Sequence, residues 1–206
     1  MANHVSGYLS VREISEEGQK VWDEYVVGTL EKYKGVGGRE YDVHLGFFIA
    51  HSVDDDGNIL MEDGELLLNS VMCDEVGAKW AYAQDWDECG ISMYSAWSPC
   101  VEFVQKIAQK IGEVDETVKL VLTYEDEFPN FVGVATFDKD GTDTDLAVEW
   151  DEIREIMCDR DPELAALWNE DEEEWTDEDA ASEIMWETQW DVINEWQSEN
   201  ELWSVV

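Results

Sequence analysis

Negative charge constrains this chain more than any other feature of its sequence. Its 206 residues carry 51 Asp and Glu against 12 Lys and Arg, which gives a formal net charge of -39. Charges of one sign repel one another and destabilise a compact state. Yet 44% of the residues are hydrophobic and 11 are tryptophan, whereas disordered acidic chains are poor in both kinds of residue. The sequence therefore predicts a folded protein that tolerates strong self-repulsion.

The same charge excludes several classes of function and location. Direct nucleic-acid binding requires a basic surface that displaces counterions from phosphates, and an anionic membrane repels an acidic protein. No apolar run approaches the roughly 20 residues that span a bilayer. The segment from Met1 to Ser6 lacks the basic and apolar regions of a signal peptide, and the four cysteines form no C-x-x-C pair. We therefore expect a cytoplasmic protein, located in the host cytoplasm if a phage encodes it.

Hydrophobic periodicity predicts an α+β fold for the first two thirds of the chain. Helices are expected over 15–34 and from Ser98 onward, with Ser98 as the N-cap and Pro99 as the first helical residue. The order in which these helices and the expected strands follow one another is typical of a ferredoxin-like split β-α-β sandwich, in which an antiparallel sheet carries its helices on one face. The expected strands cover 4–11, 45–50, 78–85, 90–97, 118–124 and 131–137.

The composition changes from Asp138 onward. The last 69 residues contain 25 acidic and 3 basic side chains, so more than half of the excess charge lies in one third of the chain. Apolar stripes persist there: Leu146, Trp150, Ile153 and Met157 have helical spacing, and a long final helix is expected after a Thr176 cap. The sequence predicts a ferredoxin-like domain at 1–137, with an irregular insertion at about 35–77. An acidic, Trp-rich helical extension packed on that domain is predicted at 138–206.

Four short motifs occur in order within the first domain. They are N-H-V-S-x-x-L-x-V from Asn3, G-A-K-W from Gly77, S-A-W-S-P from Ser95, and the acidic Tyr124–Glu127 that leads to Phe131-x-Gly133. Together they resemble the YubB-type ferredoxin-like proteins, which are phage and plasmid proteins largely without assigned biochemistry. The resemblance covers about residues 3–137 and implies the fold and a mobile-element origin. The resemblance implies no active-site residues, and it does not extend past Asp138.

Known catalytic and metal-binding patterns do not fit this sequence. The segment from Asp138 to Glu149 superficially resembles a calcium loop, but Asp143 and Asp145 stand where an EF-hand needs Gly and an apolar residue. The three histidines lack the spacing of a zinc site. No phosphate-binding loop, deaminase signature or nucleophile elbow is present. We therefore expect a protein that is not an enzyme, with no catalytic residues, no metal site and no cofactor.

The charge itself suggests mimicry of nucleic acid. Duplex DNA carries one charge per about 1.7 Å, so 39 negative charges equal the phosphates of about 20 base pairs. The hypothesis is that the protein binds and inhibits a basic host nucleic-acid-binding protein, such as a restriction enzyme, CRISPR effector, nuclease, RNA polymerase or nucleoid protein. Two alternatives remain open: an acidic interaction or assembly module, and a salt-adapted protein. Homodimerisation is a further expectation.

The residues expected to contact the partner lie in the acidic third of the chain. Carboxylates spaced three or four residues apart on a helix lie about 5–6 Å apart, which is the scale of adjacent phosphates. Tryptophan is enriched at protein interfaces, so one near the C-terminus is included. The predicted set is Asp143, Asp145, Glu149, Asp151, Glu152, Glu155, Glu170, Asp171, Glu172, Glu173, Glu174, Asp177, Glu178, Asp179 and Trp203.

Overall fold

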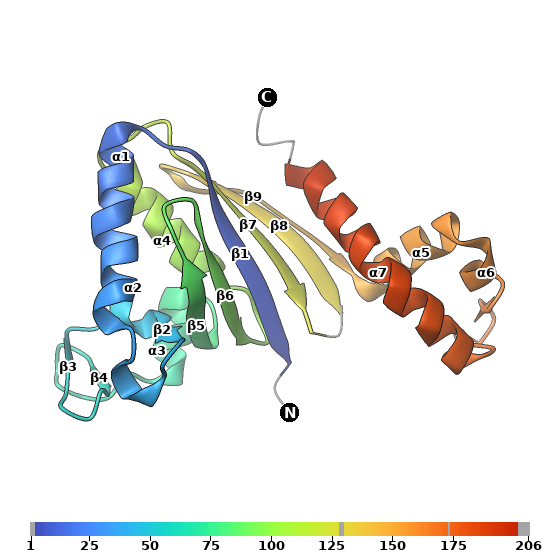
Figure 1. Ribbon diagram of the computed structural model, residues 1–206, viewed down its shortest axis with the longest axis horizontal. Helices are drawn as coiled ribbons and strands as arrows, with labels where there is room; N and C mark the ends of the chain where they lie inside the picture. Colours follow the sequence, from blue (N-terminus) through green and yellow to red (C-terminus); the bar gives the residue numbers. More distant parts are fainter. Residues whose placement is uncertain (1–2, 128–129, 173, 202–206) are drawn as a thin grey trace.

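The computed structural model describes residues 3–127, 130–172 and 174–201 and has a mixed α+β architecture (Figure 1). In these residues, one antiparallel sheet of seven strands has the order β2-β5-β6-β1-β7-β8-β9. Two short ladders lie outside it, β3 (Ser52–Val53) with β4 (Ile59–Leu60) and β10 (Trp168–Asn169) with β11 (Glu174–Trp175). The sheet strands are β1 (His4–Glu13), β2 (Val43–His44), β5 (Lys79–Trp86), β6 (Gly90–Ala96), β7 (Lys119–Asp126), β8 (Phe131–Asp138) and β9 (Gly141–Glu149).

The helices expected in the first domain cover one face of this sheet. The predicted helix at 15–34 forms as a continuous run of α1 (Glu16–Val21), a π-helical turn η1 (Trp22–Val27) and α2 (Gly28–Tyr33). The next helix, α4, covers Val101–Gly112. Both bury their apolar stripes in the main core, as helix amphipathicity requires. That core includes Leu9, Trp22, Val26, Leu30, Ile91, Val104, Ile107, Ile111, Leu120, Leu122, Ala135 and Phe137.

A second core lies on the opposite face of the sheet. Side chains alternate between the two faces along a strand, so Val132 on β8 points away from Ala135 and Phe137. Val132 packs with helices α5 (Trp150–Arg160), α6 (Pro162–Ala165) and α7 (Glu178–Glu201). The helices after residue 149 thus pack on the face of the sheet opposite α4, a placement that the sequence analysis did not specify. This core contains Val132, Val148, Ile153, Met157, Leu164, Ala181, Val192 and Ile193.

Residues 141–149 form a strand, where the sequence predicted a helical stripe beginning at Leu146. The boundary expected after residue 137 thus falls inside the β8–β9 hairpin. Strand β9 is at the edge of the sheet, and six of its nine residues in a row are exposed, so it lacks the alternation of a half-buried strand. Leu146 near the end of β9 and Trp150 at the start of α5 are four residues apart, and this spacing is the same as on one face of a helix.

The predicted strand at 45–50 is also wrong, since Leu45–Phe48 forms a 3₁₀ turn, η3. The Gly46 amide donates to His44 Nδ1 over 2.9 Å, and this bond closes the turn immediately after β2. A short apolar run does not distinguish a buried turn from a buried strand. The insertion at 35–77 also contains the 3₁₀ turn η2 (Val36–Gly38) and helix α3 (Asn69–Val76).

Two predicted helix caps have other roles. Helix α4 begins at Val101, and the Ser98 hydroxyl instead donates to the Gly77 carbonyl over 2.7 Å. Thr176 donates its hydroxyl to the Leu167 carbonyl. Asp177 takes the expected place, since its carboxylate accepts from the Ala180 amide over 3.1 Å at the start of α7.

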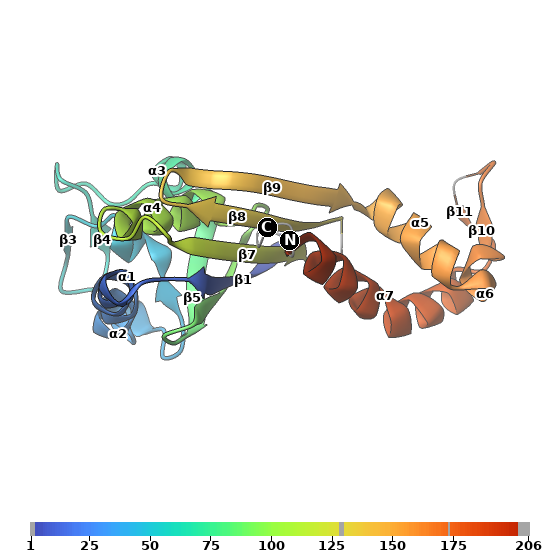
Figure 2. The same cartoon turned by 90° about the horizontal axis from the view of Figure 1, so that it is seen from above.

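The molecule is elongated, with α1 and α2 at one end and α5, α6 and α7 at the other (Figures 1 and 2). Strand β9 leads directly into α5, and residues 150–201 are termed the C-terminal lobe below. In the part of the chain that the structure describes, no helix is both long enough and apolar enough to cross a membrane.

Asp115 gives a test of how this fold is held together. It is 3% exposed, and its carboxylate accepts from the Ser15 amide over 2.6 Å and from the Thr117 amide and hydroxyl. Burial alone would raise the pKa of Asp115, but these hydrogen bonds lower it below the usual value. Stability from this group is thus complete above its unfolded-state pKa and is lost as pH falls through the folded-state pKa.

We expect Asp115→Asn to lower the free energy of unfolding by about 1–3 kcal/mol at neutral pH, because an amide cannot accept all three bonds. The difference from wild type should shrink as the pH falls below 4. Chemical denaturation at several pH values measures both effects. The neighbouring exposed Glu116, changed to Gln, serves as the control and should stay within about 0.5 kcal/mol of wild type. Equal losses in both variants would contradict the assignment.

Candidate functional site

Carboxylates and tryptophans line a cleft of about 800 Å³ in the C-terminal lobe. Three elements form it: α5, the β10–β11 hairpin and the first turn of α7. This acidic cleft gathers five residues of the predicted contact set from three separate stretches of sequence. Its lining is Trp150, Asp151, Arg154, Glu155, Cys158, Asp159, Trp168, Glu170, Glu174, Trp175 and Glu178.

Local geometry explains why these side chains meet. On α5, Asp151, Glu155 and Asp159 follow one another at intervals of four residues and therefore share a helix face. In the hairpin, Trp168 pairs directly with Trp175, and their ring centroids lie 4.9 Å apart in an edge-to-face arrangement. Such aromatic pairs are favourable beyond the area they bury. The hairpin therefore holds an aromatic wall opposite a helix face rich in carboxylates.

Arg154 is the one basic side chain that lines this cleft. Its guanidinium lies 3.8 Å from the centroid of the Trp168 ring, and its Nη1 is 3.5 Å from Asp151 Oδ1. The Arg154 side chain is only 13% exposed, so a cation–π contact and an ion pair hold it against the aromatic wall. Six carboxylates line the cleft around this one guanidinium. The cleft therefore keeps a large excess of negative charge.

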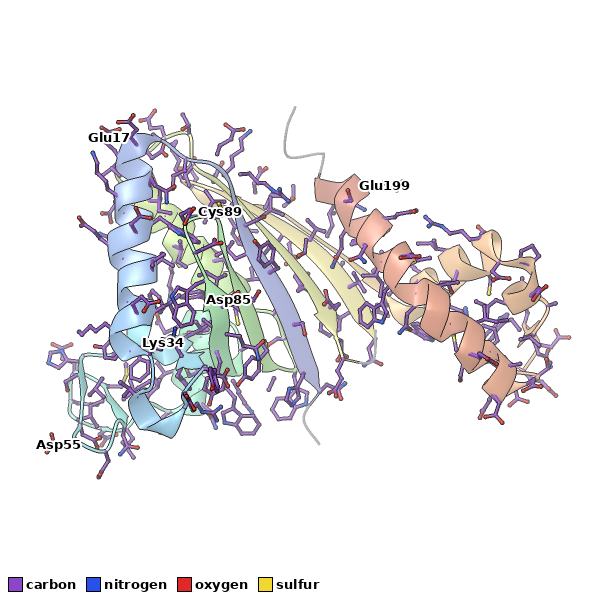
Figure 3. All side chains as sticks on the ribbon, viewed as in Figure 1. Glu17, Lys34, Asp55, Asp85, Cys89 and Glu199 are labelled. Atoms are coloured by element: carbon purple, nitrogen blue, oxygen red, sulfur yellow. The ribbon has the colours of Figure 1, made fainter. Side chains whose placement is uncertain are left out.

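The cations of the acidic third are all paired within the chain. Besides Arg154, this region contains only Lys139 and Arg160. Lys139 Nζ lies 3.4 Å from Asp140, and Arg160 Nη1 lies 2.5 Å from Glu195, which links α5 to α7. The remaining carboxylates of this region have no basic side chain of their own segment to neutralise them. Figure 3 shows acidic side chains projecting into solvent along the whole molecule, including Glu17, Asp55 and Glu199.

Three predicted contact residues lie on β9, outside the cleft. Asp143, Asp145 and Glu149 are all exposed. Asp145 pairs in register with Ala135, whose side chain packs in the main core, so it lies on the face of β9 opposite the second core. The Tyr124 hydroxyl donates to Asp145 Oδ1 over 2.7 Å and holds this carboxylate in place. The strand therefore presents its carboxylates separately from the cleft.

The other predicted residues do not line the cleft. Glu152 follows Asp151 on α5, and Glu172 accepts from the Asn169 side chain over 2.7 Å in the hairpin turn. All of these carboxylates are exposed. Glu173 and Trp203 lie outside the described residues. The predicted residues that do not line the cleft, though they are close in sequence to residues that do, are Glu152, Asp171, Glu172, Asp177 and Asp179.

The predicted contact set lacks six residues that line the cleft, namely Trp150, Arg154, Cys158, Asp159, Trp168 and Trp175. Asp159 could have been found, because it continues the four-residue spacing of Asp151 and Glu155. Arg154 could not, since its place depends on the hairpin that brings Trp168 against α5. Burial raises the pKa of the Cys158 thiol, so this cleft residue is not an activated nucleophile. Among the described residues, no three His, Cys, Asp or Glu side chains are arranged to hold a metal ion.

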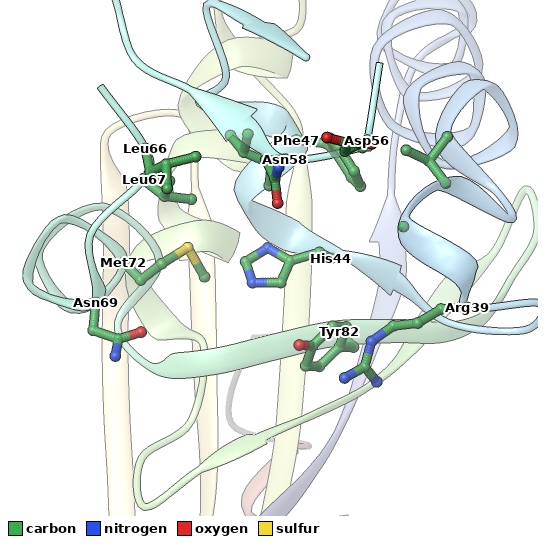
Figure 4. A pocket seen from close by; sticks show the side chains of 14 residues that line it. Arg39, His44, Phe47, Asp56, Asn58, Leu66, Leu67, Asn69, Met72 and Tyr82 are labelled. Carbon is green, nitrogen blue, oxygen red and sulfur yellow. The ribbon is translucent and has the colours of Figure 1, made fainter. Parts of the chain in front are cut away.

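A second hollow, of about 360 Å³, lies beside β2 at the far end of the molecule (Figure 4). His44 faces it, with its Nδ1 occupied by the Gly46 amide and its ring edge-on to Tyr82 at 4.9 Å. Burial, and next the charge of Arg39, lower the pKa of His44 to about 4. His44 is therefore neutral near pH 7, and its role here is to close a turn and pack against an aromatic ring.

We expect NMR titration to place the pKa of His44 below 5. Between this value and the ordinary 6.5, the unfolded chain binds more protons than the folded one, so stability should fall as the pH falls through that interval. In His44→Asn, this component of the pH dependence should disappear. Titration of the His44 ring near pH 6.5 would show that the hollow is open to solvent.

Comparison with protein-family models, with curated proteins and with solved structures finds no match for this chain. The resemblance of residues 3–137 to YubB-type proteins therefore stays a prediction.

Proposed function

We propose that this protein is a non-enzymatic decoy whose C-terminal lobe binds the nucleic-acid site of a basic protein and inhibits it. The observation that carries the proposal is the acidic cleft, where six carboxylates and three tryptophans surround a single guanidinium. A basic nucleic-acid site presents Arg and Lys side chains to phosphates. The cleft offers carboxylates in place of those phosphates, together with aromatic rings that favour arginine.

The internal pairing of Arg154 supports this choice of partner. The Trp168 ring and Asp151 together already hold one guanidinium. Glu155, Glu170 and Glu174 line the same cleft, so a second guanidinium or ammonium from a partner would find both charge and aromatic surface. Electrostatic complementarity of this kind accelerates association and excludes acidic partners.

The spacing of exposed carboxylates supports mimicry of a duplex. From Asp143 along β9 and on to Glu155 in α5, the chain covers up to about 28 Å, from 3.3 Å per strand residue and 1.5 Å per helical residue. That length is comparable with one turn of duplex DNA, about 34 Å. Figure 2 shows β9 continuing into α5 along the long axis of the molecule. The carboxylates of the strand lie apart from those of the cleft, and the two groups together would extend over about one turn of a mimicked duplex.

The body that carries this lobe supports a ferredoxin-like assignment. Strands β5, β6, β1 and β7 are neighbours in that order, a helix follows β1, and α4 connects β6 to β7. This is the order expected of a split β-α-β sandwich. Strands β8 and β9 extend it on one side and lead into the C-terminal lobe. A mobile-element origin would account for a decoy of this kind, since host defence and transcription proteins have basic nucleic-acid sites.

Competition with DNA tests the proposal. The immobilised protein should retain a basic nucleic-acid-binding protein from host lysate at about 0.1 M salt, where the Debye length is about 10 Å. Duplex DNA should displace that protein, and the purified pair should compete with DNA in a mobility-shift assay. Replacing five cleft carboxylates by amides (Asp151, Glu155, Glu170, Glu174 and Glu178) should weaken binding by at least about tenfold.

A matched control separates site-specific binding from net charge. It replaces five exposed carboxylates of the body by amides and so changes the net charge equally (Glu24, Asp55, Glu62, Glu88 and Glu116). We expect this control to change affinity by less than about threefold, through long-range steering alone. Equal weakening in both variants would place the interaction outside the cleft. Binding that DNA does not displace would favour an acidic assembly module.

A further inference from the structure

A second group of aromatic side chains lies on β1, β5 and β6, and none of these side chains lines the acidic cleft. On the face opposite α4, Tyr82 pairs in register with Tyr94, and their rings stack with centroids 5.2 Å apart. His4 stacks on the other side of Tyr94, at 6.3 Å and nearly parallel. Together with Trp80 and Arg39, these rings line a hollow of about 480 Å³, which is termed the aromatic hollow. That volume is suited to one small ligand.

Backbone strain marks the rim of this hollow. Among the described residues, Trp80 and Trp97 alone adopt a positive φ without being glycine, with values of 46° and 66°. This conformation is unfavourable for a bulky residue and is concentrated at functional sites. Both indoles are also exposed, by 46% and 48%, and lie 5.6 Å apart. The fold thus holds two tryptophans in a strained conformation without burying them.

Neighbouring segments hold this strained rim rigidly. The Trp97 amide donates to the Asn3 carbonyl over 3.0 Å, which ties the end of β6 to the start of β1. The Ser95 hydroxyl donates to the Ser98 carbonyl over 2.6 Å, and the Ser98 hydroxyl donates to Gly77 just before β5. A site whose side chains are fixed in advance binds with a smaller entropic cost.

Two cations and one carboxylate lie beside these aromatic rings. Only 12 basic residues occur in the chain, yet two of them lie here. The Arg39 guanidinium is 4.2 Å from the centroid of Tyr82, and Lys79 Nζ is 5.3 Å from that of Trp97. Asp42 holds the ring of Tyr94 in place, because it accepts from the Tyr94 hydroxyl over 2.8 Å and lies 3.6 Å from Arg39.

We propose that the aromatic hollow binds a mononucleotide, with its base stacked on the exposed rings and its phosphate beside Arg39 and Lys79. Exposed aromatic rings, here the indoles of Trp80 and Trp97, can take the flat face of any base. Cations beside those rings select an anionic ligand over a neutral one such as a sugar. The net charge of -39 opposes a nucleic-acid polymer, whereas a single phosphate needs only the local pair of cations. This function is separate from the decoy function of the lobe.

Calorimetric titration of the full chain with adenosine 5′-monophosphate tests the site. We expect saturable binding of the nucleotide, weaker binding of adenosine, and no binding of inorganic phosphate at the same concentration. Arg39→Gln should lower the affinity for the nucleotide by about fivefold or more and leave the affinity for adenosine unchanged, because only the phosphate loses a binding partner. No saturation by the nucleotide at millimolar concentration would overturn the proposal.

Trp80→Asn distinguishes a lost ligand site from a lost fold. Asparagine enters the left-handed region more readily than tryptophan, so the variant should unfold at or above the wild-type temperature. It should nevertheless bind the nucleotide at least about tenfold more weakly, because one stacking surface is gone. Trp190→Gln, which removes an exposed indole of α7 far from the hollow, should bind as wild type does.

Three results would count against the site. Wild-type affinity in Trp80→Asn would show that the ring is not a binding surface, and equal weakening in Trp190→Gln would show a non-specific effect. Tighter binding of a single-stranded oligonucleotide than of the mononucleotide would replace this proposal by a polymer site. Trp80→Asn should still bind the partner of the C-terminal lobe, so failure of one function does not imply failure of the other.

Discussion

Strand β8 is the element on which the rest of the structure depends. Six of its eight residues in a row are buried, because the strand has a packed core on each face. Ala135 and Phe137 enter the main core with the helices of the body, and Val132 enters the second core with α7. Such a strand is continuously apolar, unlike one with a solvated face. Through β8, the body fixes the position of a lobe that would otherwise repel it.

In the C-terminal lobe, the buried apolar side chains and the carboxylates that repel one another lie on different faces of the helices. The apolar side chains of α5 and α7 face one another and the sheet, while their carboxylates face solvent or the acidic cleft. An ion pair between Arg160 and Glu195 joins the two helices, and Arg154 lies within the cleft. Apolar packing is non-directional and proportional to buried area, so it can hold the lobe together without neutralising its surface. The charge stays available for a partner.

Both proposed sites contain tryptophans, but the charged side chains beside these tryptophans have opposite signs in the two sites. In the C-terminal lobe, Trp168 and Trp175 stand among carboxylates and favour a cation. At the aromatic hollow, Trp80 and Trp97 stand beside Arg39 and Lys79 and favour an anion. The two sites share no lining residue, so each can be removed by substitution without changing a residue of the other. Aromatic residues supply contact surface in both, and neighbouring charges decide what binds.

Much of the body could be predicted because its periodicity is strong. The helix at 16–33, the β5–β6 hairpin and the paired strands β7 and β8 lie within a few residues of their expected ranges. The failures have local physical reasons. Leu45–Phe48 is too short for periodicity to separate a turn from a strand, and β9 is an exposed edge without alternation. Ser98 and Thr176 do not cap their helices, because the Ser98 hydroxyl donates to the Gly77 carbonyl and the Thr176 hydroxyl donates to the Leu167 carbonyl.

By itself, the sequence determined the α+β class, the concentration of charge after residue 137 and the apolar stripes that exclude a solvated tail. Composition and short-range spacing carry that information directly. Only the tertiary structure decided which carboxylates meet. It separated Asp145 on β9 from Glu155 in the cleft, and it placed Arg154 against Trp168. Strand pairing and helix docking bring together residues that are distant in the sequence, and local sequence patterns do not predict these contacts.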